Sequence, residues 1–193
     1  MKKISVLVID NADSFTYNIV DYLRKINNIN IETQESNRIS LSEVNYFDKI
    51  IISPGPGLPK DFPIIYEIIK EYHTSKHILG ICLGYLAIGS FFGANLINIF
   101  PVVHGQAHKI KVVKQTPIFK NIPKTLKVGL YHSWAIDYKN FPKELEITAV
   151  SEYGIIMSIS SKRFNIFGIQ FHPESYITQY GFNIIKNFIN LNL

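Results

Sequence analysis

The hydrophobic residues in the first half of this chain follow two alternating periods. Residues 4–9 form a continuous apolar run rich in β-branched side chains, which is typical of a strand covered on both faces. The apolar residues that follow recur at the spacing of an amphipathic helix beginning at Asp13 or Ser14. The residues on this helical face are Phe15, Ile19, Tyr22, Leu23 and Ile26.

The same alternation continues to residue 81. Further strands are predicted at residues 29–33, 49–53 and 77–81. Ser40 and Glu43 have the spacing of a capping box and predict a short helix. The next helix is expected to have Asp61 as its cap and Pro63 in its first turn. Its buried face is expected to consist of Ile64, Ile65, Ile68, Ile69 and Tyr72.

This order of elements predicts the fold class. Each connection between parallel strands needs a covering helix, so the alternation indicates a doubly wound parallel sheet. Residues 97–171 instead contain short strand-like runs separated by Pro, Gly and Asn, which predict antiparallel additions to the sheet. Residues 181–193 predict a closing helix. We therefore expect one α/β domain over residues 1–193, a three-layer, mostly parallel sheet with added antiparallel strands.

Composition limits the classes of protein to be considered. The net charge is +5, but the lysines are scattered and no recognition motif accompanies them, so a nucleic-acid partner is not expected. The single cysteine cannot form an intrachain disulfide. No apolar run is long enough to span a bilayer, and the N-terminus does not resemble a signal peptide. We expect a cytoplasmic protein that does not bind membranes.

The only cysteine, Cys82, lies in Gly80-Ile81-Cys82-Leu83-Gly84 at a predicted strand-to-helix corner. A free cysteine is often simply a small buried hydrophobe. Here the flanking glycines allow a strained turn that presents the side chain at the sheet edge, as in the Gly-x-Ser-x-Gly elbow of hydrolases. The N-terminus of the following helix would favour a thiolate. We interpret Cys82 as a candidate nucleophile.

The segment at residues 168–175 contains a candidate partner for this cysteine. In an extended segment, His172 and Glu174 point to the same side because they are two residues apart. The imidazole can then take the thiol proton, while the carboxylate fixes its tautomer and stabilises the imidazolium. Pro173 blocks a helix and preserves this geometry. For the tripeptide His172-Pro173-Glu174 alone, an ordinary surface turn is the alternative interpretation.

An oxyanion hole is predicted at Pro54-Gly55-Pro56-Gly57. Glycine admits backbone N–H groups close to a substrate carbonyl, and proline holds them rigid. The amide of Leu83, directly after the candidate nucleophile, is the second expected donor. Pro-Gly-Pro-Gly alone is usually only a turn. However, it follows a predicted parallel strand, as does Cys82, and active sites of doubly wound sheets lie at this edge.

Five segments together resemble the class I glutamine amidotransferases, nearly from end to end and in a specific order and spacing. They are Asp10-Asn11-Ala12-Asp13-Ser14-Phe15-Thr16-Tyr17-Asn18, Ser53-Pro54-Gly55-Pro56-Gly57, Gly80-Ile81-Cys82-Leu83-Gly84, Tyr131-His132-Ser133-Trp134 and residues 168–175. The first of them is similar to the opening of the glutaminase subunits of anthranilate synthase and aminodeoxychorismate synthase. The resemblance also implies a flavodoxin-like fold.

The resemblance implies a reaction and a partner. Cys82 would attack the side-chain carboxamide of L-glutamine, and His172, oriented by Glu174, would protonate the departing ammonia. The partner would be the large, chorismate-binding synthase subunit of a hetero-oligomer, which uses the ammonia to form anthranilate or aminodeoxychorismate. The resemblance leaves these two pathways open. The residues that would hold the oxyanion or line the substrate site are Gly55, Pro56, Gly57, Leu83, Leu86, Ser133 and Trp134.

The segment after Gly84 departs from the family pattern. The family commonly has His-Gln there, and the glutamine helps to bind the substrate, whereas this chain has Tyr85-Leu86. Because Leu86 cannot form a hydrogen bond, we expect weaker glutamine binding with the triad intact. The departure motivates an alternative, a weakly catalytic or non-catalytic regulatory subunit of such a synthase. An independent cysteine hydrolase of the same fold is another.

The remaining histidines do not indicate a metal site. No spacing between Cys82 and the histidines resembles a compact zinc site. His104 lies in a His-Gly turn similar to one near the family's glutaminase cleft, where a structural role is at least as good an explanation as a catalytic one. We expect no metal and no cofactor.

Overall fold

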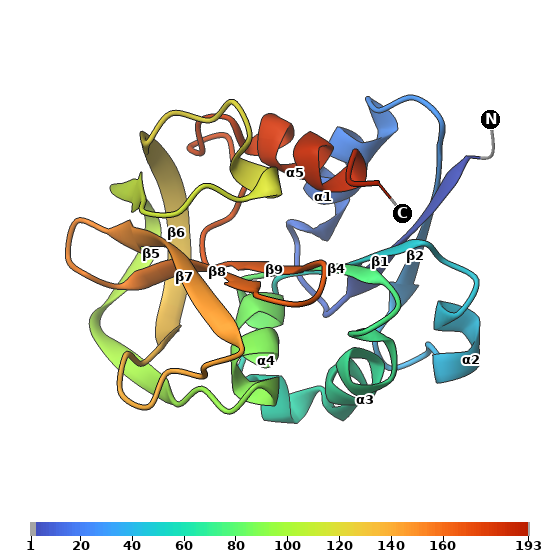
Figure 1. The fold of residues 1–193 in the computed structure, drawn as a ribbon, viewed down its shortest axis with the longest axis horizontal. Helices are drawn as coiled ribbons and strands as arrows, with labels where there is room; N and C mark the ends of the chain where they lie inside the picture. Colours follow the sequence, from blue (N-terminus) through green and yellow to red (C-terminus); the bar gives the residue numbers. More distant parts are fainter. Residues whose placement is uncertain (1–2, 193) are drawn as a thin grey trace.

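Residues 3–192, described by a computed structural model, form a nine-stranded sheet with helices on both faces (Figure 1). The strands are β1 (Ile4–Asp10), β2 (Ile29–Glu35), β3 (Lys49–Ile52), β4 (His77–Ile81), β5 (Leu96–Val112), β6 (Thr125–Ile136), β7 (Leu145–Ser151), β8 (Ile156–Ser161) and β9 (Ile166–Ile169). Their order across the sheet is β2-β1-β3-β4-β9-β8-β7-β5-β6. The predicted α/β class is therefore correct.

The helices form the two outer layers. The α-helices are α1 (Thr16–Arg24), α2 (Leu41–Val44), α3 (Pro63–Tyr72), α4 (Leu83–Phe91) and α5 (Gly181–Ile189), and the short 3-10 helices are η1 (Pro59–Asp61) and η2 (Pro117–Phe119). Figure 1 shows α1 and α5 on one face of the sheet and α2, α3 and α4 on the other. None of the helices in the described chain is long and apolar enough to cross a membrane.

The two helical layers explain why the central parallel strands β1, β3 and β4 are mostly apolar. In β1, Val6 and Val8 pack in the hydrophobic cluster that includes side chains of α1 and α5. The alternate residues Leu7 and Ile9 pack in the cluster that includes α3 and α4. Successive side chains of a strand point to opposite faces, so a strand covered on both sides has no polar face.

The predicted helices are present, but two of their starting residues are wrong. Helix α1 is preceded by Phe15, not by Asp13 or Ser14 as its cap. Asp13 instead accepts a hydrogen bond from the Phe15 N–H at 2.8 Å. Asp61 belongs to η1 and does not cap α3; its carboxylate accepts the Leu58 N–H at 2.9 Å. Each carboxylate accepts a hydrogen bond from a nearby backbone N–H in a turn. Such local hydrogen bonds compete with helix capping.

Helix α5 ends earlier than the predicted closing helix. It spans Gly181–Ile189, whereas the sequence pattern continues to residue 193. Ile184, Ile185, Phe188 and Ile189 are its buried apolar residues. The final residue of the predicted helix, Leu193, lies outside the described residues. The apolar period therefore located this helix but overestimated its length.

The prediction for residues 97–171 is correct for four strands and wrong for the fifth. Strands β5, β6, β7 and β8 pair antiparallel. Strand β9 pairs antiparallel with β8 but parallel with β4, with Ile81 opposite Ile169. A four-residue apolar run carries no information about strand direction, which is why the sequence could not reveal this pairing. The parallel pair β4–β9 places the ends of both strands at one edge of the sheet.

Candidate active site

Cys82 lies at a strained corner between β4 and α4. Its backbone has φ 51° and ψ −99°, which is unusual for a residue other than glycine. A Cβ atom on Gly80 would lie 2.4 Å from the Gly84 backbone, and one on Gly84 would lie 2.6 Å from the Ile52 carbonyl oxygen. The two glycines therefore permit a turn that presents the sulfur at the sheet edge, as the sequence predicted.

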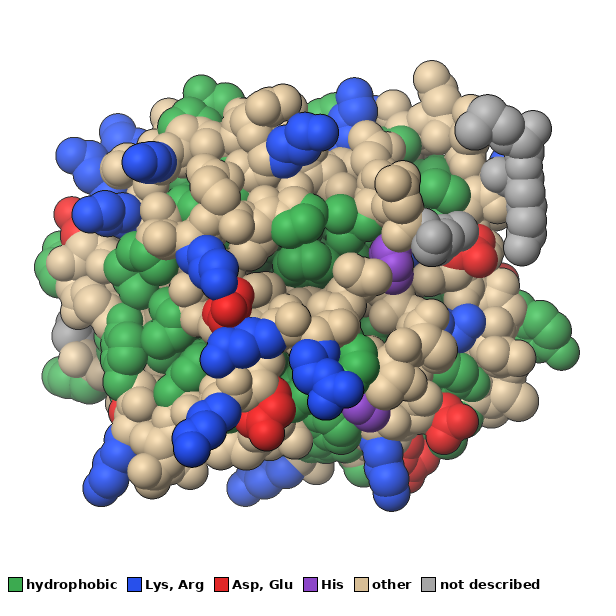
Figure 2. Space-filling model, viewed as in Figure 1, with side chains coloured by type: hydrophobic (Ala, Val, Ile, Leu, Met, Phe, Trp, Pro, Cys, Tyr) green, Lys and Arg blue, Asp and Glu red, His purple; other side chains and the backbone are tan. Residues whose placement is uncertain are grey.

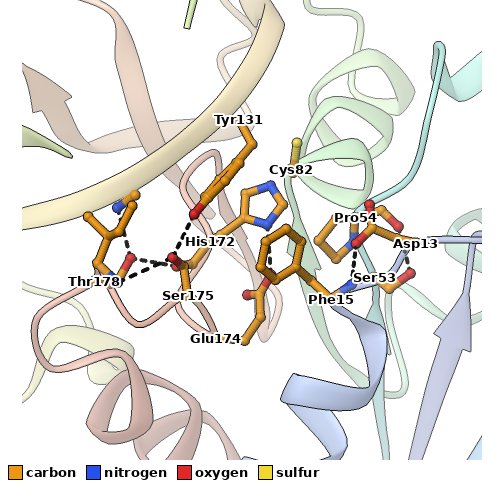
Figure 3. Close-up of polar contacts among 12 residues, drawn as sticks. Asp13, Phe15, Ser53, Pro54, Cys82, Tyr131, His172, Glu174, Ser175 and Thr178 are labelled. Atoms are coloured by element: carbon orange, nitrogen blue, oxygen red, sulfur yellow. Dashed lines mark hydrogen bonds and ion pairs between the residues drawn. The ribbon is translucent and has the colours of Figure 1, made fainter. Parts of the chain in front are cut away.

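The pairing of β4 with β9 brings the cysteine to the histidine. The Cys82 N–H donates to the Ile169 carbonyl oxygen at 2.9 Å, which continues the parallel ladder by one residue. His172 follows Ile169 by three residues. Figure 3 shows Cys82 beside the imidazole, on the side opposite Glu174. The sheet thus joins two residues separated by 90 positions in the sequence.

The backbone of His172 is held by β6 and by a turn. The His172 N–H donates to Gly129 O at 3.1 Å, and the Thr178 hydroxyl donates to His172 O at 2.5 Å. The Ser175 N–H also donates to His172 O, at 3.3 Å. The expected extended conformation of residues 172–174 is therefore wrong, because a turn begins at His172. The turn still brings the two side chains together.

His172 and Glu174 form a buried ion pair. Nδ1 of His172 lies 2.7 Å from Oε1 of Glu174, and both residues are almost completely buried. Burial by itself lowers the pKa of His172, but hydrogen bonding and charge interactions with Cys82 and Glu174 raise this pKa well above its ordinary value. Nε2, the nitrogen not bonded to Glu174, has no partner with full hydrogen-bond geometry among the described residues, although the nearby Cys82 contributes to the raised pKa. It is thus available to a reacting group beside Cys82.

Two aromatic rings enclose the imidazole. The centroid of the Tyr131 ring lies 4.8 Å from that of His172, and the centroid of Phe15 lies 5.3 Å from it. The Tyr131 hydroxyl lies 2.9 Å from the Ser175 hydroxyl (Figure 3). Sequence reasoning gave Phe15 and Tyr131 no role in the site, although both lie in the quoted motifs; Phe15 was expected on the apolar face of the first helix and instead precedes α1. Together they restrict rotation of the His172 ring.

Gln170 is a second neighbour that sequence reasoning missed. Its side chain is fully buried, and Nε2 lies 3.8 Å from the Cys82 sulfur. Its Oε1 atom is buried without a hydrogen-bond partner in the described part of the chain. The sequence signal for Gln170 was a polar residue directly after a fully apolar strand. A buried side-chain amide usually forms hydrogen bonds through both its nitrogen and its oxygen, so such a residue is expected to have specific partners.

A cavity of about 160 Å³ opens beside the sulfur. It is much smaller than the roughly 300–1,000 Å³ of pockets for drug-sized molecules, and it suits a ligand the size of one amino acid. Every predicted oxyanion or substrate-binding residue lies in its wall. The wall consists of Gly55, Pro56, Gly57, Cys82, Leu83, Leu86, Tyr131, His132, Ser133 and Trp134.

The two residues that depart from the family pattern have different positions. Leu86 lies in the cavity wall and is 3% exposed. Tyr85 is fully buried on the other side of α4, where its hydroxyl donates to the Ile156 carbonyl oxygen at 2.9 Å. Only Leu86 can therefore act directly on a ligand in the cavity.

The glycine-rich loop is shaped by close packing. A Cβ atom on Gly55 would lie 2.5 Å from Leu83 Cδ2 and 2.8 Å from Asn11 Cβ. Gly57 has φ +70°, a conformation that disfavours side chains. Asn11 also ties the loop to β1, since its N–H donates to the Ser53 hydroxyl at 3.0 Å. The loop backbone is thus fixed against the start of α4.

The described residues include no cluster of three or more His, Cys, Asp or Glu side chains that could hold a metal ion. His104 is exposed, and its ring centroid lies 5.3 Å from that of Tyr131, so it reaches the site only through this aromatic ring. The groups that the site presents for chemistry are a thiol, an imidazole and a carboxylate beside backbone amides.

Comparisons with known proteins agree with this geometry. The family model described as glutamine amidotransferase class-I matches residues 7–191. Anthranilate synthase component 2 of Cyanophora paradoxa is 42% identical over 188 residues, covering 96% of this chain and 98% of that protein. Aminodeoxychorismate synthase component 2 of Klebsiella aerogenes is 35% identical over 187 residues, covering 96% and 99%.

Solved structures show the same fold. A protein from Thermoplasma acidophilum, provisionally described as one of the subunits of GMP synthase, has a TM-score of 0.88 and 26% identity. The match covers 98% of this chain and 94% of that protein.

Proposed function

This chain belongs to the class I glutamine amidotransferases, and from this premise we propose that it is the glutaminase subunit of a chorismate-using synthase. The observation that carries the proposal is the buried His172–Glu174 pair beside Cys82, which itself lies in the wall of a cavity the size of an amino acid. The substrate is L-glutamine, and the products are glutamate and ammonia. The partner is the chorismate-binding subunit of a hetero-oligomer.

The first half-reaction forms a thioester. The Cys82 sulfur attacks the carboxamide carbon of glutamine and forms a tetrahedral intermediate. As this intermediate collapses, the carbon–nitrogen bond breaks, and protonated His172 donates a proton from Nε2 to the leaving nitrogen. Neutral ammonia leaves, and the γ-glutamyl thioester stays on Cys82. The raised pKa of His172 supports this step because it keeps the imidazole protonated.

The second half-reaction hydrolyses the thioester. Neutral His172 removes a proton from water as the water oxygen attacks the thioester carbon. The carbon–sulfur bond then breaks, which releases the γ-carboxyl group of glutamate and regenerates the thiolate beside the imidazolium. Glu174 orients the ring and stabilises its positive charge through the 2.7 Å contact with Nδ1. Both half-reactions use one imidazole in two protonation states.

The cavity wall stabilises the intermediates and positions the substrate. Backbone amides of Gly55, Gly57 and Leu83 are assigned to the oxyanion, because fixed N–H groups stabilise developing charge without reorganisation. The Ser133 and Trp134 segment of β6 is assigned to the amino-acid end of glutamine. Pro56 holds the glycine loop rigid, and Leu86 contributes an apolar surface without a hydrogen bond.

Ammonia passes to the partner subunit for anthranilate or aminodeoxychorismate formation. The relatives include components of both synthases, at 42% and 35% identity. In bulk water ammonia would be protonated and would lose its nucleophilicity, so transfer within the complex protects it. We propose a cytoplasmic location for this biosynthetic role.

The first test compares the wild type with Cys82→Ala in the assembled synthase. We expect glutamine-dependent product formation to fall by at least about a thousandfold, because the nucleophile is lost. Product formation from added ammonium salt should be unchanged, which provides the control for folding and assembly. Near-normal glutamate release by the variant would overturn the mechanism. The pathway is identified by supplying chorismate and measuring anthranilate and aminodeoxychorismate separately.

A further inference from the structure

A second cavity lies behind the wall of the first. Its volume is about 540 Å³, and its apolar lining consists mainly of Ile99, Phe100, Val102, Leu130, Ile155 and Met157. His132 lies in the walls of both cavities. The smaller cavity contains Cys82, and the larger one lies between β5, β6 and the β7–β8 turn. A single side chain therefore lies at the boundary between the nucleophile and this apolar space.

His132 is a buried polar residue whose hydrogen bonding is incomplete. It is only 6% exposed, and its Nδ1 atom has no hydrogen-bond partner among the residues that the structure describes. A buried imidazole nitrogen without a partner costs free energy unless a ligand or water bonds to it. The proposed mechanism gives His132 no role, so its unpaired nitrogen requires another explanation.

The surroundings of His132 keep it neutral. Burial, with smaller contributions from the nearby His172 and His108, lowers the pKa of His132 to about 4. A neutral imidazole has one donor nitrogen and one acceptor nitrogen. Ammonia has three N–H donors and one lone pair, so it can bond to His132 in either tautomer. A neutral ring also cannot protonate the ammonia.

We propose that ammonia released at Cys82 leaves through the larger cavity, with His132 as its binding residue at the boundary. This inference rests on the proposed glutaminase function. Ammonia arises in the smaller cavity when His172 protonates the leaving nitrogen, and it crosses the boundary without further bond changes. The apolar lining disfavours ammonium, because a charged group loses hydration there, and so keeps the product neutral.

The far side of the larger cavity reaches the protein surface. Phe100 is 91% exposed, Val102 54% and Tyr153 72%, and all three belong to its lining. Figure 2 shows apolar side chains gathered at the left of the molecule, where Figure 1 places β5 and the β7–β8 turn. Ammonia would escape there unless the cavity were covered. The synthase subunit, which consumes ammonia, is the partner that we assign to this surface.

The first experiment tests the boundary with His132→Leu in the assembled synthase. Glutamate release and chorismate-derived product are measured together, with and without added ammonium salt. We expect product formed per glutamate to fall severalfold, while the ammonium-dependent rate stays at the wild-type level. His132→Gln keeps a donor and an acceptor and should restore most of the coupling, that is, of the amount of product formed per glutamate released. Unchanged coupling in His132→Leu would overturn the proposal.

The second experiment tests the outlet with a matched pair of valines. Val102 lines the larger cavity and is 54% exposed, whereas Val113 is 50% exposed and lies outside that lining. We expect Val102→Trp, but not Val113→Trp, to lower product per glutamate. Complex formation is measured by size-exclusion chromatography. Equal coupling in the two variants would contradict the outlet, while a Val102→Trp variant that no longer assembles would support the partner surface.

The glutaminase proposal and the ammonia route fail in different ways. If the wild-type complex releases no glutamate from glutamine, the proposed function fails. If it releases glutamate and His132→Leu keeps full coupling, only the route through the larger cavity fails.

Discussion

At the scale of single residues, substrate affinity and chemistry are separable in this site. Cys82 and Leu86 both lie in the cavity wall, whereas the His172–Glu174 pair lies beside Cys82 and outside that wall, and is joined by the contact between Nδ1 and Oε1. The class I family commonly has glutamine at this position. An apolar side chain there cannot form a hydrogen bond with a ligand in the cavity. The expected consequence is a change in the Michaelis constant rather than in the mechanism.

Leu86→Gln should lower the Michaelis constant for glutamine. One added hydrogen bond is worth about 1–1.5 kcal/mol, which corresponds to roughly a tenfold change in affinity. The measurement is the glutaminase rate against glutamine concentration in the assembled enzyme. Leu86→Met has nearly the same volume and no comparable donor, and it should keep the wild-type constant. A Michaelis constant that rises in Leu86→Gln would show that the cavity binds glutamine in another way.

Residue patterns predicted the reacting groups better than their neighbours. Cys82 between glycines and the His172–Glu174 pair are local signals, so the sequence was sufficient to propose them. The contacts of Phe15, Tyr131 and Gln170 with the site depend on how distant elements pack. No local spacing encodes such contacts. The same reason explains why the sequence assigns no role to His132, whose position between two cavities depends on the packing of β5 and β6.

At the scale of elements, the site depends on the parallel pair β4–β9 and on the packing of α5. The alternating pattern predicted β1 to β4 and their helices well, because each helix follows its strand directly. It could not predict that β9 enters the sheet beside β4. That pairing, and not the length of any element, brings the two halves of the site together. A substitution at the first residue of α5 that displaces the turn at residues 172–174 should therefore lower the catalytic rate.

Gly181→Ala tests this dependence. A Cβ atom on Gly181, the first residue of α5, would lie 1.8 Å from the Pro173 carbonyl oxygen. Either α5 or the turn that carries His172 and Glu174 must move, which costs about 1–3 kcal/mol of stability. We expect kcat to fall at least tenfold, since misplacement by about 1 Å can cost about a hundredfold. Steady-state kinetics and urea unfolding measure the two effects.

Gly93→Ala is the control for this variant. Gly93 has φ +96°, and no atom lies within 4 Å of the point that a Cβ atom would occupy, so alanine there strains only the backbone. It should lose a comparable amount of stability and keep its kcat. If both variants lose activity in proportion to stability, α5 has no specific role in positioning the turn.

At the scale of the whole molecule, buried histidines lie toward both ends of the sheet. At the amino ends of β3 and β4, Nζ of Lys49 lies 2.9 Å from Nδ1 of His77 and donates to the Leu191 carbonyl oxygen at 2.7 Å. Burial and the Lys49 charge lower the pKa of His77 to about 4. His132, beside the catalytic cavity, has a pKa of about 4 because of burial and neighbouring histidines. Both residues are neutral in the folded protein at neutral pH.

The free energy of unfolding should therefore fall as the pH decreases from about 6.5 to about 4. In this interval the unfolded chain binds protons at His77 and His132 that the folded protein does not, so stability increases with pH. Each histidine contributes at most about 3 kcal/mol to this change in the free energy of unfolding. His77 contributes less, because solvent near the end of the sheet screens its charge. His172 has the opposite sign: its raised pKa gives stability that is present below about 6.5 and is lost as the pH rises through the folded-state value.

Urea unfolding at a series of pH values between 4 and 7 measures this dependence. We expect the His132→Gln and His77→Asn variants to lose less stability on acidification than the wild type, because one coupled proton is removed in each. His104→Gln changes an exposed histidine and should keep the wild-type slope. If all three variants follow the wild-type curve, the buried histidines do not control acid stability, and carboxylate protonation must account for the loss.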